Sequence, residues 1–284
     1  MTGWKAAVAV RKLVSCLAGL LAAMAGAASA AADPWPATVR AVYDINFNGF
    51  NVGTFEFQSQ AERESYTLLA NAKLSVLLGA FTWNGETRSF GLIVNQKPKP
   101  ASFSFDFRSN LRAGSTKLGF ADGIVTDIVH LPPPPPAADT IPLRQQHLQG
   151  VIDPLTAIMV LSRGASANPC DRRIPIFDGK ERFDLLFSYK GEMKVTEQLP
   201  SGQPDIAHVC RVRYLPIAGH KVDMETKFMA ANDAIEVALR PIPSANVLVP
   251  IQVYIPTMAG SAAIVSKRVE IIAAPGKPHI ALLH

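Results

Sequence analysis

The sequence has 284 residues, with 28 Lys and Arg, 23 Asp and Glu, and a net charge of +5. The first thirty residues contain three of the basic residues and no acid, so the remaining 25 bases and 23 acids leave a charge of only +2. This near balance argues against a nucleic-acid partner, because proteins that bind nucleic acids carry a pronounced basic surface.

Residues 1–30 have the pattern of a secretory signal peptide. Three basic residues precede the short apolar run Leu13–Met24, and Ala28-Ser29-Ala30 supplies small residues for cleavage after Ala30 or Ala32. The run is too short to span a bilayer comfortably, which disfavours a retained anchor. We therefore expect export and no stable transmembrane segment after cleavage, with a transmembrane β-barrel as an open alternative.

Cysteine usage supports an oxidising compartment. Cys16 lies in the expected signal peptide, which leaves Cys170 and Cys210 as the cysteines of the mature chain. Two cysteines in an exported protein predict one disulfide bond, and closing a loop of about 40 residues would stabilise the fold by about 4 kcal/mol. Two free buried thiols or a metal pair are the alternatives. Without a CxxC motif or a nearby histidine cluster, we expect neither a metal site nor a cofactor.

The first stretch after the signal peptide reads as a β-hairpin. Apolar and polar residues alternate over 39–58, and Asn48-Gly49 predicts a two-residue turn. A regular register would direct the phenylalanines of the second strand away from Tyr43, whereas a β-bulge near Gly53 would return them to the same face.

Further strands are predicted over 65–94, 101–109 and 116–131. Asn84-Gly85 and Asp122-Gly123 predict two more tight turns, while Leu74–Leu78 fits either a strand or one helical turn. Prolines at 132–136 then predict an extended segment. We interpret 132–142 as a Pro-rich crossover loop between an N-terminal β half, 33–131, and a C-terminal β half of the same domain, 143–284.

The C-terminal half begins with a helix and a hairpin. Asp153 is a predicted N-cap and Pro154 occupies the favoured first helical position. Asp178-Gly179 predicts a two-residue type I′ turn that would pair Phe177 with Lys180. One face of this hairpin would be apolar, and Arg182 and Asp184 would be neighbours on the other face.

The remaining strands are predicted over 206–219, 220–230, 233–242, 247–257 and 262–274. Short connections and the lack of strand–helix alternation predict an antiparallel sheet. The expected fold is therefore mainly β, as a large antiparallel curved sheet or open β-barrel with one or two short helices.

Four segments together resemble a known family: "YDINFNGFNVGTFEF", "DPLTAIMVL", "IPIFDGKERFDLLF" and "CRVRYLPIAG". They are similar to an uncharacterised family of exported bacterial proteins, domain of unknown function 3108, over about Val39 to Ile272. The resemblance implies a β-rich exported protein of the Gram-negative envelope, which together with the signal pattern gives the periplasm as the expected location. It supplies no catalytic residues.

The sequence contains no HExxH, GxSxG, phosphate-loop or dinucleotide motif, so no catalytic residue is nominated. Our leading hypothesis is a non-enzymatic periplasmic protein that binds an apolar or amphipathic envelope molecule, such as a lipid, or helps to assemble the envelope. The candidate ligand-lining residues are Tyr43, Phe55, Phe57, Phe103, Phe105 and Phe107, although the same side chains can fill a core.

Two alternatives belong to other functional classes. The first is an envelope hydrolase that uses Asp178, Glu181 and Asp184, although turn geometry and sheet polarity already account for all three acids. The second is a structural or interaction module that acts through its surface and its proline loop. A deep apolar cavity would favour the binding protein, convergent carboxylates the hydrolase, and a filled interior the interaction module.

Overall fold

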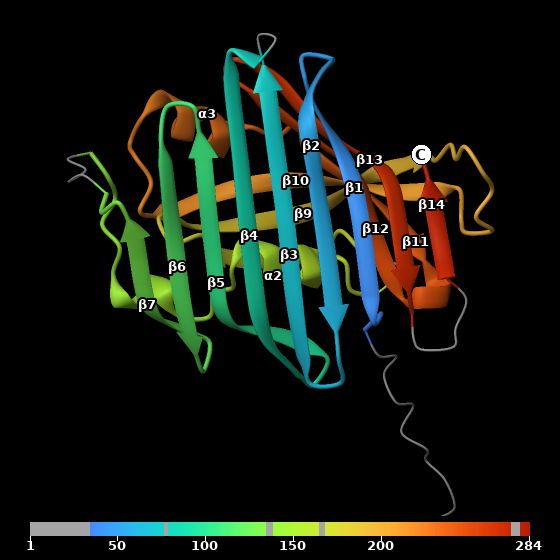
Figure 1. Ribbon diagram of the computed structural model, residues 1–284, viewed down its shortest axis with the longest axis horizontal. Helices are drawn as coiled ribbons and strands as arrows, with labels where there is room; N and C mark the ends of the chain where they lie inside the picture. Colours follow the sequence, from blue (N-terminus) through green and yellow to red (C-terminus); the bar gives the residue numbers. More distant parts are fainter. Residues whose placement is uncertain (1–34, 77–78, 135–138, 165–167, 274–278) are drawn as a thin grey trace, which may run out of the picture. The chain divides into compact units, whose positions relative to one another are not determined.

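The computed structural model describes residues 35–76, 79–134, 139–164, 168–273 and 279–284, all within one unit, Pro34–His284. The expected signal peptide, Leu77-Leu78 and the end of the proline run lie outside the described residues. A single antiparallel sheet of 14 strands dominates the described part of the chain (Figure 1). The predicted fold class, a large curved antiparallel sheet with two short α-helices, is confirmed.

The N-terminal half contributes seven strands that pair in sequence order. They are β1 (Thr38–Phe47), β2 (Phe50–Ala61), β3 (Ser65–Val76), β4 (Phe81–Val94), β5 (Lys97–Ser109), β6 (Ala113–Ala121) and β7 (Ile124–Leu131). Asn48-Gly49 and Asp122-Gly123 form the predicted tight turns, and all four residues have positive φ, as a type I′ turn requires.

The C-terminal half continues the same sheet. Its strands are β8 (Arg172–Phe177), β9 (Arg182–Lys194), β10 (Ile206–Ala218), β11 (Ile235–Ile242), β12 (Val247–Thr257), β13 (Gly260–Ile272) and β14 (His279–Leu283). Its helices are η3 (Gln145–Leu148), α2 (Pro154–Leu161), α3 (Met224–Ala231) and η4 (Pro243–Ala245). Because β13 pairs with β1, the strand order runs from β7 through β1 and β13 to β8.

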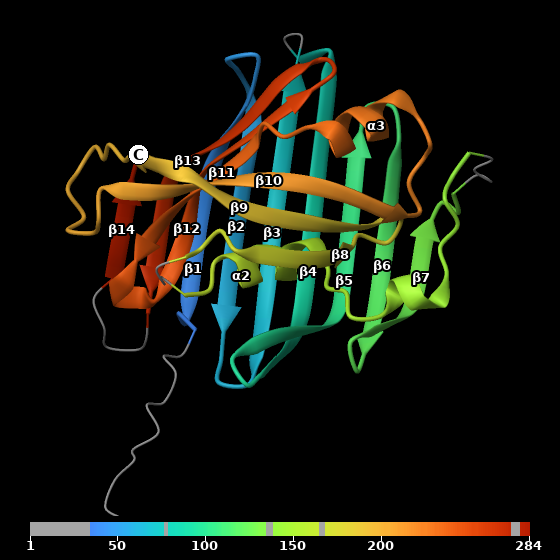
Figure 2. The ribbon, with the colours of Figure 1, turned by 180° about the vertical axis from the view of Figure 1, so that it is seen from behind.

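The sheet curves without closing, since β7 and β8 are the two ends of the strand order. A short segment lies between these ends: Gln149 forms a bridge with Ile124 of β7, and Ile152 forms one with Ile176 of β8. Figure 2 shows β8, β9 and β10 crossing the direction of β3 to β6, with α2 lying against β3, β4, β5 and β8. The helix therefore covers part of the inner face of the sheet.

The predicted β-bulge is confirmed. Asn46 pairs with Asn51 but Ile45 pairs with Gly53, so the β2 strand has one extra residue at this point. The shift places Tyr43 opposite Phe55, with ring centroids 5.9 Å apart. The inner face of the first hairpin is therefore aromatic because of a single inserted residue.

The turn predicted at Asn84-Gly85 is wrong, because both residues lie inside β4. Gly85 leaves room there for the Trp83 ring, since a Cβ atom at this position would lie 2.3 Å from the ring unless the ring moved. A glycine within a strand can mark a place where another group approaches the backbone closely. The ambiguous stretch from Leu74 continues β3 as far as Val76.

The Asp178-Gly179 turn is longer than predicted. Phe177 pairs with Arg182, so four residues connect β8 and β9. The Asp178 carboxylate accepts the backbone N–H groups of Lys180 and Glu181 at 2.8 and 2.7 Å, which stabilises this wider turn. The register moves by an even number of residues, so the apolar face of the hairpin is as predicted.

The strand predicted over 220–230 is also wrong. Its second part forms α3, where the Asp223 carboxylate caps the helix by accepting the Thr226 N–H at 2.9 Å. Met, Glu, Lys and Ala are good helix formers, and the cap decides between helix and strand in a segment without strong periodicity.

Candidate ligand-binding cavity

An apolar cavity of about 240 Å³ lies between β1–β2, α2 and β11–β13. No charged side chain lines it. The polar side-chain groups of the lining are two serine hydroxyls, the Tyr43 hydroxyl and the Trp35 indole N–H. The lining residues are Trp35, Pro36, Val39, Ala41, Tyr43, Phe55, Phe57, Ser59, Ile158, Met159, Leu161, Ser162, Val237, Val247, Leu248, Val249, Pro250, Val253, Ile264 and Val269.

The first wall consists of three cross-strand pairs on the inner face of the β1–β2 hairpin. Val39 faces Ser59, Ala41 faces Phe57, and Tyr43 faces Phe55. The short side chain of Ala41 leaves space at the centre of this wall, beside the larger rings. Burial raises the pKa of the Tyr43 hydroxyl, which therefore stays neutral at physiological pH.

The second wall is α2, and its N-terminus is held by a buried hydrogen-bond network. The Asp153 carboxylate, fully shielded from solvent, accepts the N–H groups of Leu155 and Thr156 at 3.0 and 2.9 Å. It also accepts the Ser89 hydroxyl at 2.9 Å, and Tyr66 bonds to the Thr156 hydroxyl at 2.9 Å. These bonds tie the helix to β3 and β4. Burial raises the pKa of Asp153.

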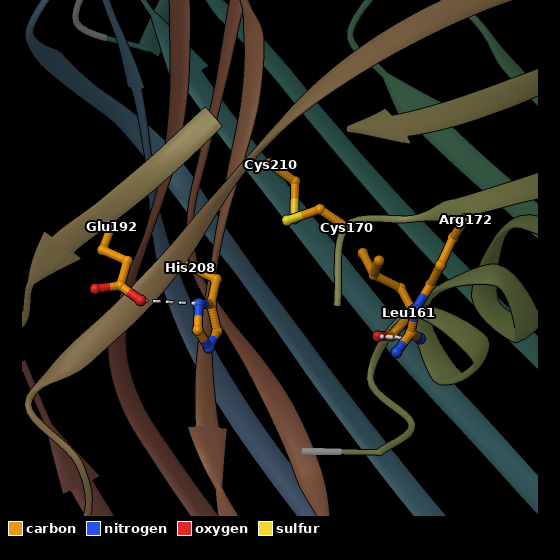
Figure 3. The surroundings of a disulfide bond; sticks show 6 residues. All are labelled: Leu161, Cys170, Arg172, Glu192, His208 and Cys210. Carbon is orange, nitrogen blue, oxygen red and sulfur yellow. Dashed lines mark hydrogen bonds and ion pairs between the residues drawn. A yellow bond between two sulfur atoms is a disulfide. The ribbon is translucent and has the colours of Figure 1, made fainter. Parts of the chain in front are cut away.

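The C-terminus of α2 is held by a half-buried arginine. The Arg172 guanidinium donates to the carbonyl oxygens of Val160, Leu161 and Arg163 at 2.9, 3.0 and 2.8 Å (Figure 3). Cations are favourable at this end of a helix because the last carbonyl groups lack partners within the helix. With both ends fixed, α2 presents Ile158 and its neighbours to the cavity in one orientation.

One end of the cavity lies beside the β4–β5 turn. Trp35 lines the cavity and donates its indole N–H to the Gln96 carbonyl at 3.3 Å. The Arg163 guanidinium lies over the Trp35 ring, 4.7 Å from its centre, and donates to the Gln96 side chain at 3.2 Å. This end of the cavity therefore has several polar neighbours, while the Tyr43 hydroxyl lies further along β1.

The structure places three of the six candidate ligand-lining residues at the cavity: Tyr43, Phe55 and Phe57. Phe103 is instead buried in a packed cluster with residues of β3 to β7 and α2, and Phe105 packs against that cluster. Phe107 stacks on Phe105 with ring centroids 5.9 Å apart. The period-two pattern assigned these aromatic residues to the inner face of the sheet. It did not reveal which of them pack in the core and which line the cavity.

Sequence reasoning did not nominate the α2 and β12 walls of the cavity. Met159, Val247 and Val249 come from segments far from β1 in the sequence. Their apolar character is typical of any core position, so no local signal distinguished them.

The predicted disulfide is confirmed. Cys170 and Cys210 are bonded, with Cα atoms 5.3 Å apart, and both are fully buried (Figure 3). The bond joins the segment before β8 to the middle of β10. His208, on the same strand, lies 3.5 Å from the Glu192 carboxylate.

The three acids of the β8–β9 hairpin have structural partners. Asp184 is fully buried and forms ion pairs with Arg173 and Arg182, the latter at 2.5 Å, as the sequence predicted for Arg182. Glu181 accepts from Lys180 at 3.2 Å and from the Tyr214 hydroxyl at 3.1 Å. Within the described ranges, no group of three or more His, Cys, Asp and Glu side chains is arranged to hold a metal ion.

Fold and cavity together define a mainly β protein whose curved, unclosed sheet surrounds an apolar space. The model of the family described as protein of unknown function (DUF3108) matches residues 42–265, and the chain belongs to this family. None of the helices in the described part of the chain is both long and apolar enough to cross a membrane.

A solved structure has the same fold: the β-barrel-like protein of domain of unknown function DUF1849 from Brucella abortus. The TM-score is 0.52 at 11% sequence identity, and the match covers 84% of this chain and 99% of that chain. A search of curated proteins gave no match.

Proposed function

We propose that this protein is a non-enzymatic periplasmic envelope protein that binds an apolar molecule, or the apolar part of an amphipathic one, between β1–β2, α2 and β11–β13. The observation that carries the proposal is the cavity of about 240 Å³ with no charged lining residue. Export is supported by the signal pattern of residues 1–30 and by the buried disulfide, since disulfides persist in oxidising compartments.

A cavity of this size is expensive to leave empty. Unfilled volume in a protein core costs about 24 cal/mol per Å³ where it is enclosed, so the part of this space that its walls shield from solvent carries such a penalty. Water gains little there, because each buried water needs two to four polar partners. An apolar ligand restores the missing contacts and is therefore the favoured occupant.

The arrangement of the acids supports a non-enzymatic role. Asp178 serves the turn, and the ion pairs of Asp184 fix it within the hairpin. A general acid or base must reach a substrate atom, and these carboxylates are already used by neighbouring backbone and arginine groups.

The test is extraction and mass spectrometry of molecules that co-purify with the mature protein, combined with titration of an apolar fluorescent probe. We expect a recovered lipid-like molecule and saturable probe binding. Val39→Phe, which enters the cavity, should reduce probe binding. Val42→Phe, on the opposite face of the same strand, is the matched control and should not. A native wild-type protein that binds no apolar probe would exclude the proposal.

A further inference from the structure

We infer that one edge of the sheet docks on the surface of a phospholipid bilayer. This docking edge consists of the β1–β2, β5–β6 and β12–β13 turns, and each turn exposes one large apolar side chain: Phe50, Leu111 or Met258. The docking edge lies on the outside of the molecule, so the inference goes beyond the cavity and its proposed ligand. It is carried by the position of these side chains, by the charges around them and by the contrast with the opposite edge of the sheet.

The three turns lie at the same edge of the sheet. A continuous row of paired residues crosses the strands from β5 to β12 shortly before the turns: Ser109, Trp83, Leu74, Gly53, Ile45, Ile264 and Val253. Leu111 lies two residues beyond this row, Phe50 three and Met258 five, so all three lie at the upper edge in Figure 1. The outermost turns are six strand spacings of about 4.8 Å apart, which is about 29 Å along the sheet.

Hydrogen bonds hold two of these turns against their neighbours. The Asn48 N–H donates to the Ser261 carbonyl, and the Asn48 side chain accepts the Ser261 N–H, both at 2.8 Å. The Asn110 side chain donates to the Ala80 carbonyl at 2.8 Å, which ties the β5–β6 turn to the connection between β3 and β4. The apolar side chains therefore stand on a formed scaffold, so docking does not have to order the turns.

The exposure of the three side chains is unusual. Leu111 and Phe50 are the two most exposed large hydrophobic side chains in the described part of the chain, at 80% and 76%, and Met258 is 58% exposed. A single exposed apolar residue is ordinary and needs no explanation. Three of them at three turns of one edge indicate a surface that an apolar partner covers.

The docking edge carries one positive charge and no acid. Beyond the row of paired residues, the three hairpins contain residues 46–52, 110–113 and 254–263, among which Arg112 is the one charged residue. Lipid head groups present phosphates, which favour a guanidinium and repel a carboxylate. The nearby helix α3, bonded to β12 through Asn232 and the Pro256 carbonyl at 2.9 Å, contains one acid and one base and so adds no net charge.

The turns of the opposite edge have a different character. The β2–β3 turn contains Glu62, Arg63 and Glu64, and the β6–β7 turn contains Asp122, all of them exposed. The exposed apolar residues near that edge, such as Val94, belong to strand β4 and pair with lysines of β5. Apolar turns are therefore specific to one edge and are not a general property of the hairpins in this sheet.

A lipid surface fits the docking edge better than a protein surface does. Polar turn residues separate the three side chains, so they do not form the continuous apolar core of a stable protein interface. A fluid bilayer accommodates separate side chains, because each one displaces lipid independently. Along the strands the three differ by at most three residue positions, about 10 Å, which is close to the depth of about 5–10 Å that apolar faces reach at a bilayer surface.

The first experiment measures co-sedimentation of the mature protein with vesicles of phosphatidylcholine, with and without phosphatidylglycerol. We expect binding to both compositions. Phe50→Ser and Leu111→Ser should each weaken binding about tenfold, because burial of one such side chain changes a partition constant by about this factor. Val94→Ser, at the opposite edge, is the matched control and should bind like wild type. All three side chains are exposed, so the unfolding temperatures should stay close to that of wild type.

A second experiment locates the contact. Leu111→Cys, labelled with a polarity-sensitive dye, should show blue-shifted emission when vesicles are added. Glu62→Cys with the same dye reports on the opposite edge and should show no shift. Both positions are exposed, so the label does not disturb the core. A shift at position 62 and none at position 111 would overturn the inference.

The remaining outcomes are equally decisive. If wild type binds neither kind of vesicle, or if Val94→Ser loses as much binding as Leu111→Ser, the docking edge is wrongly assigned. A wild-type dimer that Phe50→Ser dissociates, without vesicle binding, would show that a second copy covers this edge instead. Binding of an apolar probe in the cavity should be the same in wild type and in these variants, so the proposed function and this inference can fail independently.

Discussion

Two regions of the inner face of one sheet show the same sequence pattern and opposite packing. Under β3 to β7, Tyr66, Leu68 and Phe103 are almost completely buried against each other and against α2. Under β1 and β2, Phe55 and Phe57 are only partly buried and line a cavity. Alternation fixes which face of a strand is apolar, but the elements that lie opposite decide whether that face becomes a filled core or an open wall.

The largest expected difference between the two regions is the effect of a buried charge. Phe103→Asp should unfold the protein or cost several kcal/mol, because the carboxylate would be buried without a partner. Phe57→Asp should cost less, because this side chain is only partly buried and lines the cavity. Urea unfolding followed by circular dichroism measures both. Equal losses would show that the β2 position is packed as tightly as the β5 position.

The disulfide lies in a packed cluster, outside the cavity lining. The double substitution Cys170→Ala with Cys210→Ala should lower the free energy of unfolding by about 2–5 kcal/mol. Below its unfolding temperature, the variant should keep its affinity for an apolar probe. Loss of probe binding in a fully folded variant would mean that the disulfide shapes the cavity as well as the core.

Adding volume should have opposite effects in the two regions. Ala70→Ile, in the filled region, should destabilise by about 1–3 kcal/mol through overpacking. Ala41→Ile, at the cavity, should be neutral or stabilising by up to about 1 kcal/mol, because it fills space that is otherwise open. Thermal unfolding of the two variants, without ligand, gives the comparison. Equal destabilisation would argue against a cavity at Ala41.

The smallest expected effect is a pH dependence of the filled region. Burial raises the folded-state pKa of Asp153, so the folded protein holds this proton more tightly than the unfolded chain does. The resulting stabilisation is present at low pH and is lost as pH rises through the folded-state pKa. Wild type should therefore lose stability relative to Asp153→Asn as pH rises from 4 to 7. If the urea midpoints of wild type and Asp153→Asn changed by the same amount across this pH range, the raised pKa of Asp153 would be contradicted.

Local patterns predicted most of the fold. Three features that depend on a few adjacent residues were predicted correctly: the tight turn at Asn48-Gly49, the bulge before Gly53 and the Asp153 cap. The turn at Asn84-Gly85 was wrong because Gly85 serves a ring-packing contact with Trp83. Residues 224–231 form a helix because of the Asp223 cap, which alternation alone did not reveal.

The cavity was only half predictable. Tyr43, Phe55 and Phe57 were nominated from the first hairpin, whose register is local. The opposite wall, including Met159 and Val249, is brought there by pairing of β13 with β1 across more than half of the chain. No short-range pattern encodes which apolar residues meet at such a distance, or how much space they leave.

The segment between β7 and β8 determines where the sheet is locally least stable. In the described part of the chain, no strand ladder joins these two ends of the sheet. Gly150 donates to the Gly123 carbonyl at 2.8 Å, and Ile152 exchanges two backbone hydrogen bonds with β8, each 3.0 Å long. Separating the ends therefore requires only a few hydrogen bonds and side-chain contacts to break, fewer than opening a closed barrel would require. We therefore expect local opening at this seam while the strand ladders of the rest of the sheet stay paired, which faster backbone amide exchange at Gly150 and Ile152 than in β3 to β5 would show.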